Sequence, residues 1–401
     1  MITAKFVKPR AFPWNSARVP EQVDRLQNIS GDLSLNREEL WEIGREDRLG
    51  FRKQTPSLSF SATQYEYGSM KFWYDLANKE DPASGDDHYI DLDDLTTKKC
   101  ELAAFLTDED DVFVGTIYLP NIRVNGFSIN IGDPDAIVER SFDLISEKYR
   151  IIDGEYFAYD SASVSVIGNK VITLSPVPVE YATGKYIYRV LRVRAGAVTN
   201  LAEGTDTNQW SYATGDVTVR DCEVSDLIKV YYVSATAYDT LWTDNDTVPQ
   251  TLQADYCEIY MKVGTGARIY RLQSVGIDVS FEREDHKEIG NSEVVQTGVT
   301  SKTVTISLNR FGENFTLEQI LAGDGTMPDI DPEEFVENVQ LLVKIYDDKL
   351  HSNFKIGYLC TGLTPSTLGF TQDVQANMES SNALIGTNMK ISDDESEVAL
   401  L

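Results

Sequence analysis

The stretch RLQNISGDLSLNREELWEIG, residues 25–44, appears a second time as RLQSVGIDVSFEREDHKEIG, residues 271–290. Aligned without a gap at an offset of 246, the two stretches are identical at ten of twenty positions. Residues 118–145 match residues 358–385 at an offset of 240, with eight identities in 28 positions. Because the blocks keep their order along the chain, the sequence indicates a tandem duplication of one domain.

The duplication predicts three parts in the 401-residue chain. We expect a first repeated domain over residues 1–150, an insertion over 151–238, and a second repeated domain over 239–401 that ends in a flexible tail. The insertion has no twin, and its short β-branched and aromatic runs between turn residues predict a small, Ig-like β-sandwich. The predicted fold class is therefore mainly β, with two tandem sandwich- or barrel-forming domains, a short helix in each, and an inserted β-sandwich.

Two segments of each repeat alternate polar and apolar residues, which predicts strands with one buried face. Their polar face carries small hydroxyls and acidic residues but no Lys or Arg. Two interpretations fit: an ordinary sheet with a Ser- and Thr-rich exterior, or a wall along which something anionic slides. The predicted members of this face are Asp32, Ser34, Asn36, Ser57, Ser59, Ser61, Thr63, Asp278, Ser280, Glu282, Thr303, Thr305, Ser307 and Asn309.

The net charge of −28 argues against ordinary nucleic-acid binding, which neutralises phosphates with Lys and Arg. It is compatible with a surface that DNA passes without sticking, with simple solubility, or with a salty habitat. The insertion carries seven Lys and Arg against ten Asp and Glu, so most of the negative charge lies in the repeats. Apolar runs are too short to span a bilayer, and we expect no membrane partner.

The sequence lacks the common patterns of catalysis and metal binding. Its three histidines form no paired motif, and no nucleophile elbow, zincin, Walker or dinucleotide motif occurs. Acidic runs such as 84–94 and 107–111 lack the EF-hand spacing, which favours solvated loops over Ca²⁺ sites. The four scattered cysteines are expected to be buried free thiols. We therefore expect no enzyme, no cofactor and no metal.

Each repeat has the same order of elements: a strand, a long charged connection, a hydroxyl-rich strand, and a short helix such as FTLEQIL, residues 315–321. This order resembles the tail tube protein of long-tailed viruses of bacteria and archaea, over about 25–145 and 240–390. The resemblance implies β-sandwiches flanked by a helix, rings whose inner sheets join into one barrel, and stacked rings through which double-stranded DNA passes without tight binding. It also implies a place in the virion tail after assembly in the host cytoplasm, with further copies of the chain, the tape measure and the tail terminator as partners.

Single-domain members of this family form rings of six, so the resemblance implies a ring of three for a duplicated chain. The dimensions agree, because six domains of four strands, spaced about 4.8 Å and tilted about 40°, close a barrel roughly 48 Å across. That width admits a DNA duplex roughly 20 Å wide. The predicted polar face would line the channel, and we expect the insertion to project outward from the tube.

In the family, the long connection packs against the neighbouring ring, a role that would fall here on 38–55 and 284–301. From the residues alone, a solvated charged turn is the commoner structure for such a segment. The implied inter-ring or inter-subunit contacts are Arg37, Glu38, Glu42, Arg48, Arg283, Glu284 and Glu288.

Two other functions remain open at this point. One is another ring of the same machine, such as a distal tail or baseplate protein. The other is a carbohydrate-binding adhesive virion surface protein that uses aromatic residues of the insertion. Trp210, Tyr212, Tyr231 and Tyr232 suit sugar binding, although aromatic residues of strands belong more often to a core.

Overall fold

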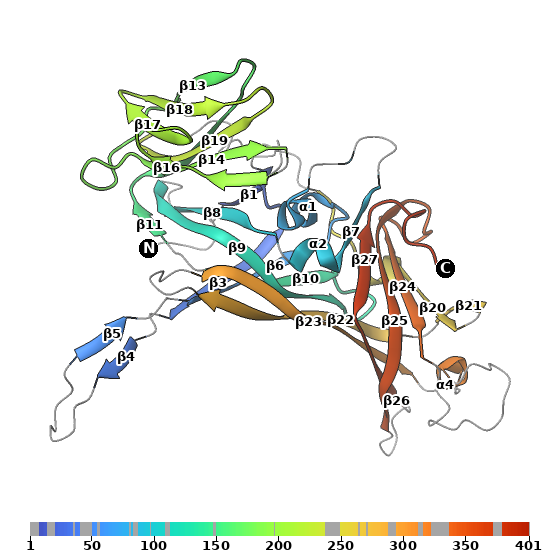
Figure 1. Cartoon of the computed structure of the whole chain (residues 1–401). Helices are drawn as coiled ribbons and strands as arrows, with labels where there is room; N and C mark the ends of the chain where they lie inside the picture. Colours follow the sequence, from blue (N-terminus) through green and yellow to red (C-terminus); the bar gives the residue numbers. More distant parts are fainter. Residues whose placement is uncertain are drawn as a thin grey trace, which may run out of the picture.

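The computed structural model of the chain is mainly β, as predicted (Figure 1). Its described α-helices are short: α1 (Lys71–Ala77), α2 (Leu92–Thr96) and α4 (Thr316–Leu321). The structure describes residues 8–13, 21–34, 37–40, 50–53, 57–79, 82, 87–96, 98–108, 113–146, 150–195, 197–236, 249–263, 265–269, 272–287, 294–311, 316–321, 337–371 and 379–400.

One antiparallel sheet runs through both repeats, and we call it the shared sheet. Its strand order is β3–β6–β10–β9–β22–β23–β26–β25, with the first four strands from the first repeat and the last four from the second. The strands are β3 (Leu26–Ser34), β6 (Ser57–Tyr65), β10 (Glu139–Ser146), β9 (Phe113–Ile131), β22 (Leu272–Lys287), β23 (Val294–Phe311), β26 (Glu379–Gly386) and β25 (Phe354–Thr371).

The two halves of the shared sheet meet where β9 pairs with β22. Val275 pairs with Ile131 at one end of this contact, and Ser280 pairs with Gly126 at the other. Each half uses its strands in the same order, with β3, β6, β10 and β9 corresponding to β22, β23, β26 and β25. The duplication therefore places two equivalent four-stranded units side by side in one sheet.

Bulges fix which residues of the two repeats correspond. The register shift in the β3–β6 pair after Leu26 recurs in the β22–β23 pair after Leu272, at the offset of 246. The shift between Asp143 and Leu144 of β10 recurs at the equivalent positions of β26, at the offset of 240. For these strands, the offsets read from the sequence agree with the structure.

The sequence alignment of β9 with β25 is wrong by one residue. Their shared bulges and the left-handed pair Asn121 (φ 59°) and Gly362 (φ 67°) require an offset of 241 rather than 240. A shift of one residue exchanges the two faces of a strand. Accordingly, Tyr118 packs in a cluster against the insertion, whereas Tyr358 lies in the core of the repeats. Their identity is therefore not a structural equivalence.

A second layer covers each half of the shared sheet. In the first repeat it has the order β2–β1–β8–β9–β11, and in the second β21–β20–β24–β25–β27–β7, so that β9 and β25 belong to both layers. The strands not yet given are β1 (Lys8–Pro13), β2 (Glu21–Gln22), β7 (Tyr89–Asp91), β8 (Cys100–Thr107), β11 (Arg150–Asp153), β20 (Cys257–Val263), β21 (Thr265–Arg268), β24 (Val339–Tyr346) and β27 (Asn388–Ser392).

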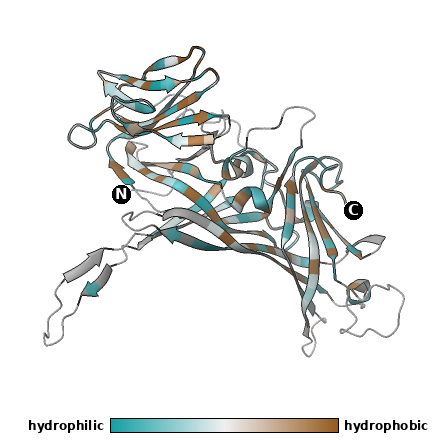
Figure 2. Ribbon diagram, in the orientation of Figure 1, coloured by the Kyte–Doolittle hydropathy of each residue, from teal (hydrophilic) through white to brown (hydrophobic). Residues whose placement is uncertain are grey.

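The repeats share one hydrophobic core between these layers. Figure 2 shows hydrophobic and hydrophilic residues alternating along the strands of the shared sheet, as the sequence predicts. In the first repeat, Trp73 of α1 packs edge-on against Phe127 and Phe142, with ring centroids 4.9 Å from both. The helix thus covers the apolar face of the shared sheet and leaves the polar face turned away from it.

The residues between the repeats form two four-stranded sheets, β12–β19–β14–β15 and β13–β18–β17–β16, which pack around a core of their own. The strands are β12 (Tyr156–Ser163), β13 (Gly168–Thr173), β14 (Ile187–Arg194), β15 (Ala197–Asn200), β16 (Ala202–Glu203), β17 (Gln209–Ala213), β18 (Asp216–Cys222) and β19 (Leu227–Ser234).

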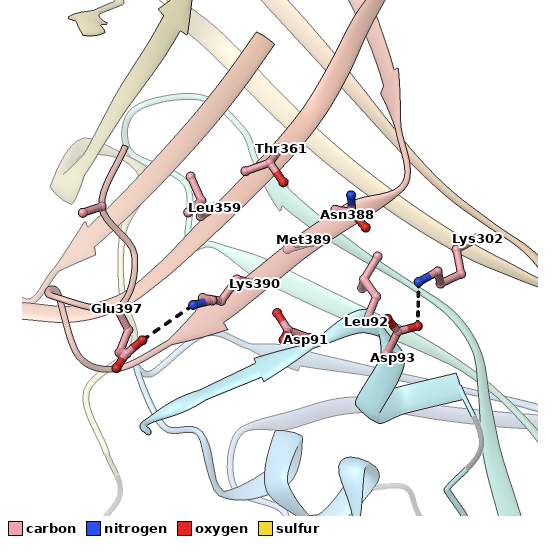
Figure 3. A pocket seen from close by; sticks show the side chains of 11 residues that line it. Asp91, Leu92, Asp93, Lys302, Leu359, Thr361, Asn388, Met389, Lys390 and Glu397 are labelled. Atoms are coloured by element: carbon pink, nitrogen blue, oxygen red, sulfur yellow. Dashed lines mark hydrogen bonds and ion pairs between the residues drawn. The ribbon is translucent and has the colours of Figure 1, made fainter. Parts of the chain in front are cut away.

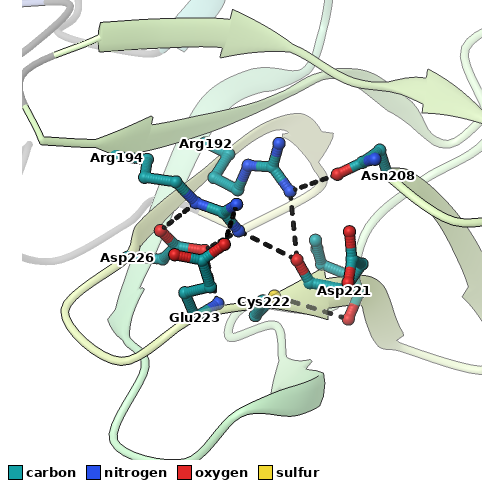
Figure 4. A network of polar contacts seen from close by, with 8 residues as sticks. Arg192, Arg194, Asn208, Asp221, Cys222, Glu223 and Asp226 are labelled. Atoms are coloured by element: carbon teal, nitrogen blue, oxygen red, sulfur yellow. Dashed lines mark hydrogen bonds and ion pairs between the residues drawn. The ribbon is translucent and has the colours of Figure 1, made fainter.

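A polar network closes one end of this sandwich (Figure 4). The Arg194 guanidinium donates to both carboxylate oxygens of Asp226, at 2.8 and 2.7 Å. Arg192 donates to the side-chain oxygen of Asn208 at 2.7 Å and to the carbonyl oxygen of Asp221 at 3.2 Å. Hydrogen bonds from Arg194 and the burial of the Asp226 carboxyl act in opposite directions, and the bonds prevail and lower its pKa. The loop between β18 and β19 is thereby held to β14.

The sandwich docks on the first repeat through a buried aromatic cluster. Tyr118 of β9 stacks on Phe157 of β12, with ring centroids 4.0 Å apart. Beside them, the buried Glu101 carboxylate of β8 accepts hydrogen bonds from Arg189 of β14 and from the Tyr118 hydroxyl. In Figure 1 the sandwich, α1 and α2 lie on the same side of the shared sheet. The polar face of that sheet is therefore turned away from the insertion.

Candidate functional site: the polar face of the shared sheet

The predicted polar residues of both repeats lie on one face of the shared sheet, and we call it the polar face. Alternate residues of β6, β22 and β23 point to it, because their neighbours are buried in the core, and the residues of β3 join them through cross-strand pairs such as Asp32 with Ser59. Two predicted members cannot be placed there: Asn36 lies outside the described residues, and the side chain of Ser57 is not described. The placed members are Asp32, Ser34, Ser59, Ser61, Thr63, Asp278, Ser280, Glu282, Thr303, Thr305, Ser307 and Asn309.

The structure adds strands that the sequence analysis did not assign to this face. Because β10 lies between β6 and β9, its alternate residues continue the polar rows across the first repeat, and β26 does the same in the second. The added polar residues are Ser128, Asn130, Glu139, Ser141, Asp143, Glu379 and Ser381. Alternation in ERSFDLIS and ESSNALIG, together with the repeat, is the sequence signal that could have found them.

Neighbouring strands hydrogen-bond to one another across the polar face. The hydroxyl oxygens of Ser30 and Ser61 are 2.7 Å apart, and those of Thr63 and Ser141 are 3.0 Å apart. In the second repeat, the Asn309 amide donates to the Ser274 hydroxyl at 3.0 Å. These contacts occupy part of the hydrogen-bonding capacity of the side chains. The surface therefore offers fewer free hydrogen-bond donors than its composition suggests.

Charge on the polar face is acidic. Asp32, Asp143 and Asp278 are exposed, and at the junction Asp278 of β22 pairs with Ser128 of β9. Partial burial raises the pKa of the Asp278 carboxyl above its ordinary value. None of the placed or added members is Lys or Arg, and Arg123 of β9, which pairs with Ile145 in the same rows, is buried. Two isoleucines, Ile145 and Ile385, interrupt the polar rows.

A buried ion pair holds the opposite side of the sheet. The Arg140 guanidinium of β10 donates to Gln64 at 2.8 Å and to the Glu66 carboxylate at 3.1 Å, and Arg140 and Glu66 are both fully buried. Tyr358 of the second repeat donates its hydroxyl to the same carboxylate at 2.6 Å. Through Tyr358, this buried network joins the two repeats on the core side of the shared sheet.

Arg283, predicted as an inter-subunit contact, binds the other repeat of its own chain. Its guanidinium donates to the carbonyl oxygens of Thr96, at the end of α2, and of Val124 in β9. The solvated turn that the residues alone favour is therefore wrong for Arg283. Glu284 is exposed.

The other predicted contact residues are not placed by the structure. Arg37 and Glu38 lie in the hairpin of β4 (Arg37–Leu40) and β5 (Gly50–Lys53), which extends away from the body in Figure 1, but their side chains are not described. Glu42, Arg48 and Glu288 lie outside the described residues.

A shallow pocket lies where the first repeat meets the second repeat's outer layer, beside β7 and β27 (Figure 3). Lys302 of β23 pairs with Asp93 of α2 at 2.6 Å. Lys390 of β27 lies 3.8 Å from the Tyr89 ring centroid and 3.6 Å from the Glu397 carboxylate. The Lys302–Asp93 pair and the Lys390–Tyr89 contact join the two repeats, whereas the Lys390–Glu397 pair lies within the second. We therefore interpret the pocket as part of the contact between the repeats.

The described residues hold neither a cluster suited to a metal ion nor a helix suited to span a membrane. They contain no group of three or more His, Cys, Asp or Glu side chains placed to hold a metal ion. None of the helices in the described part of the chain has the length and apolar character needed to cross a membrane.

No protein-family model matches the chain, and no curated protein matches it. Among solved structures, the chain is similar to a chain of the "Cryo-EM structure of the anti-feeding prophage (AFP) baseplate, 6-fold symmetrised". The two share 14% sequence identity with a TM-score of 0.27, and the match covers 36% of this chain and 91% of the other. A similarity of this size assigns the chain to no family.

Proposed function

We propose that the chain is a structural tail tube protein of a virus, in which three copies close the shared sheet into a ring. Stacked rings would conduct double-stranded DNA along the polar face. The observation that carries this proposal is the β9–β22 junction, which joins two equivalent units side by side. Repetition of one such operation closes a ring when the rotation between units divides a full turn.

The number of strands supports a ring of this size. Each chain contributes eight strands to the shared sheet. Three copies would close a barrel roughly 48 Å across between backbones, at a strand spacing of about 4.8 Å and a tilt of about 40°. Side chains on both walls remove about 10 Å of that width. The remaining space still exceeds a duplex roughly 20 Å wide.

The chemistry of the polar face suits transport rather than binding. Its carboxylates repel phosphates, and its hydroxyls are partly bonded to one another. Tight binding of DNA normally relies on Lys and Arg at the contact surface, whereas the placed and added members of this face include neither and Arg123, paired with Ile145, is buried. DNA would therefore meet no tight binding site on the polar face.

The insertion would stand on the outside of the tube, because the polar face is turned away from it. Partners would be further copies, the tape measure and the tail terminator, with a final location in the virion tail. The alternative role in sugar binding is disfavoured, because three of the four candidate aromatic residues, Trp210, Tyr231 and Tyr232, are buried and cannot contact a sugar.

Electron microscopy of the purified protein tests the proposal. We expect stacked rings with threefold symmetry, with Asp278 toward the lumen and the insertion outside. A chain that stays monomeric at high concentration, or rings with the polar face outward, would overturn it. Copy number in purified particles separates a tube protein, which is abundant, from a distal tail or baseplate ring, which is scarce.

A further inference from the structure

We propose that β3 of one copy pairs with β25 of the next, in the register that β22 and β9 show within one chain. This inference deepens the proposed ring and rests on it, because it takes a second copy of the chain as the partner. It adds the residue-level seam along which copies join. The seam follows from the repeat and from differences in burial between equivalent residues.

The shared sheet ends in two strands that have one neighbour each in the described chain. On this sheet β3 pairs with β6, and residues 364–371 of β25 pair with β26. Both strands have equivalents at the junction, where β22 and β9 pair with each other. The edge of β3 that has no strand beside it in the described chain is thus the counterpart of a paired edge, and so is that of β25. Long unpaired edges are normally covered in native proteins.

Equivalent residues are less buried at the free ends than at the junction. Val275 of β22 is 0% exposed, whereas its counterpart Ile29 of β3 is half-buried. Phe127 of β9 is 2% exposed, whereas its counterpart Leu368 of β25 is half-buried. Apolar residues that the other repeat covers at the junction therefore lack that cover at the ends of the sheet. A second copy of this chain supplies it.

The outer layer shows the same difference more strongly. Ile391 of β27 is 0% exposed, because β7 of the first repeat pairs beside it and places Ile90 opposite. The offset of 241 for β9 and β25 makes Ile151 of β11 its counterpart, since Ile151 pairs with Ile117 and Ile391 pairs with Tyr358. Ile151 is 68% exposed. This isoleucine lies where the next copy would contact the first.

The two offsets transfer the register of the junction to the seam. Subtracting 246 from β22 and adding 241 to β9 converts each observed pair into an inferred pair. Asp278 with Ser128 becomes Asp32 with Gly369, and the other observed pairs convert in the same way. Five of the six inferred pairs lie within the described residues: Ser30 with Thr371, Gly31 with Phe370, Asp32 with Gly369, Leu33 with Leu368, and Ser34 with Thr367; the sixth would join Ile29 to residue 372, outside them.

The residue types at the seam are complementary. Where the junction pairs Ile277 with Ile129, the seam pairs the smallest residue, Gly31, with the large Phe370. The next apolar pair, Val279 with Phe127, becomes Leu33 with Leu368. Polar pairs stay polar or small, so the alternation of faces continues across the seam. A register slipped by one residue would set polar residues against the apolar row.

Cysteine pairs test the register in the full-length protein. We expect Ser34→Cys with Thr367→Cys to form disulfides between copies under mild oxidation, up to a closed three-chain species on a non-reducing gel. The slipped pair, Asp32→Cys with Thr367→Cys, lies about 7 Å further apart along the strand and should cross-link at least about tenfold more slowly. Asp278→Cys with Ser128→Cys is the matched control, because these residues pair within one chain.

The outer contact has its own pair of variants. Ile151→Glu places a charge in an apolar contact. We therefore expect the protein concentration at which copies associate to rise by at least about tenfold. Val166→Glu is the control, because Val166 is 74% exposed but lies in the insertion, away from the proposed seam. Equal effects of the two substitutions would overturn the role of Ile151.

The outcomes separate the seam from the ring. If microscopy of the unsubstituted protein shows rings while the slipped pair cross-links faster, the register is wrong and the proposed function stands. If the unsubstituted protein forms no ring at any concentration, the proposed function fails, and the seam fails with it. If Ser34→Cys with Thr367→Cys cross-links rapidly and the slipped pair does not, the result supports both the seam and the ring.

Discussion

Arg140 and Arg310 occupy the same cross-strand site in the two repeats, but they come from opposite strands. In the first repeat Arg140 of β10 pairs with Gln64 of β6, and in the second Ser380 of β26 pairs with Arg310 of β23. Each arginine faces a carboxylate: Arg140 lies 3.1 Å from Glu66, and Arg310 lies 2.9 Å from Glu318. The repeats thus keep one buried guanidinium per unit while its strand of origin differs.

Removing Arg140 should destabilise the protein strongly. Arg140→Met leaves the Glu66 carboxylate buried without its cation, at an expected cost of about 3–5 kcal/mol. Thermal unfolding followed by calorimetry measures the effect. In the double variant with Glu66→Gln, part of the loss should be recovered, because no charge is then buried alone. A double variant no more stable than Arg140→Met would contradict this account.

Gly126 should be required for the junction between the repeats. A Cβ atom there would lie 2.6 Å from the Val279 carbonyl oxygen, which belongs to the neighbouring strand and cannot move away by itself. Gly126→Ala is expected to cost about 1–3 kcal/mol, measured by denaturant unfolding. Gly298→Ala is the control, because nothing lies within 4 Å of its added Cβ. Similar losses in both variants would show that the close approach is not the cause.

The Glu101–Arg189 pair should make docking of the insertion depend on pH when the arginine is removed. Burial raises the pKa of Glu101 above its ordinary value, and Arg189 opposes that rise. In Arg189→Met we expect a larger rise and weaker docking at neutral pH.

The sign of this pH dependence follows from proton binding. A carboxyl whose folded pKa exceeds its unfolded pKa binds more protons when folded, so stability increases as pH falls through the folded pKa toward the unfolded pKa. Hydrogen exchange of residues 227–234 in Arg189→Met should therefore slow, after correction for intrinsic rates, when the pH is lowered from 7 to 5. The double variant with Glu101→Gln should lose this response; if the response persists, another group is responsible.

Reversing charge on the polar face should slow genome passage without preventing assembly. Asp32→Lys with Asp278→Lys places cations on the proposed channel wall, where phosphates can bind them. We expect tubes of normal appearance by microscopy and slower DNA release from particles. Asp206→Lys with Asp216→Lys makes the same charge change in the insertion. Release at the unsubstituted rate in the first double variant would refute the electrostatic role.

Local patterns predicted much of the fold, and pairing between distant segments set the rest. Alternation of residue types correctly assigned Leu58, Phe60, Val304 and Ile306 to the core. The offset of 241 between β9 and β25 could not be read from the sequence, because identities at 240, such as Tyr118 with Tyr358, favoured the wrong alignment. The contact of Arg283 with Val124 could not be predicted either. It depends on which strand lies beside β22, and that neighbour comes from a distant part of the sequence. The duplication signals two equivalent units but not how they meet.

Strand β9 has a mechanical consequence. Its first half carries Tyr118, against which the insertion docks, and its second half carries Phe127, which pairs across the junction with Val279. A pull on the insertion along the strand axis is therefore transmitted through covalent bonds to a row of parallel hydrogen bonds. Such a row is loaded in shear, so that its bonds resist together instead of opening one after another.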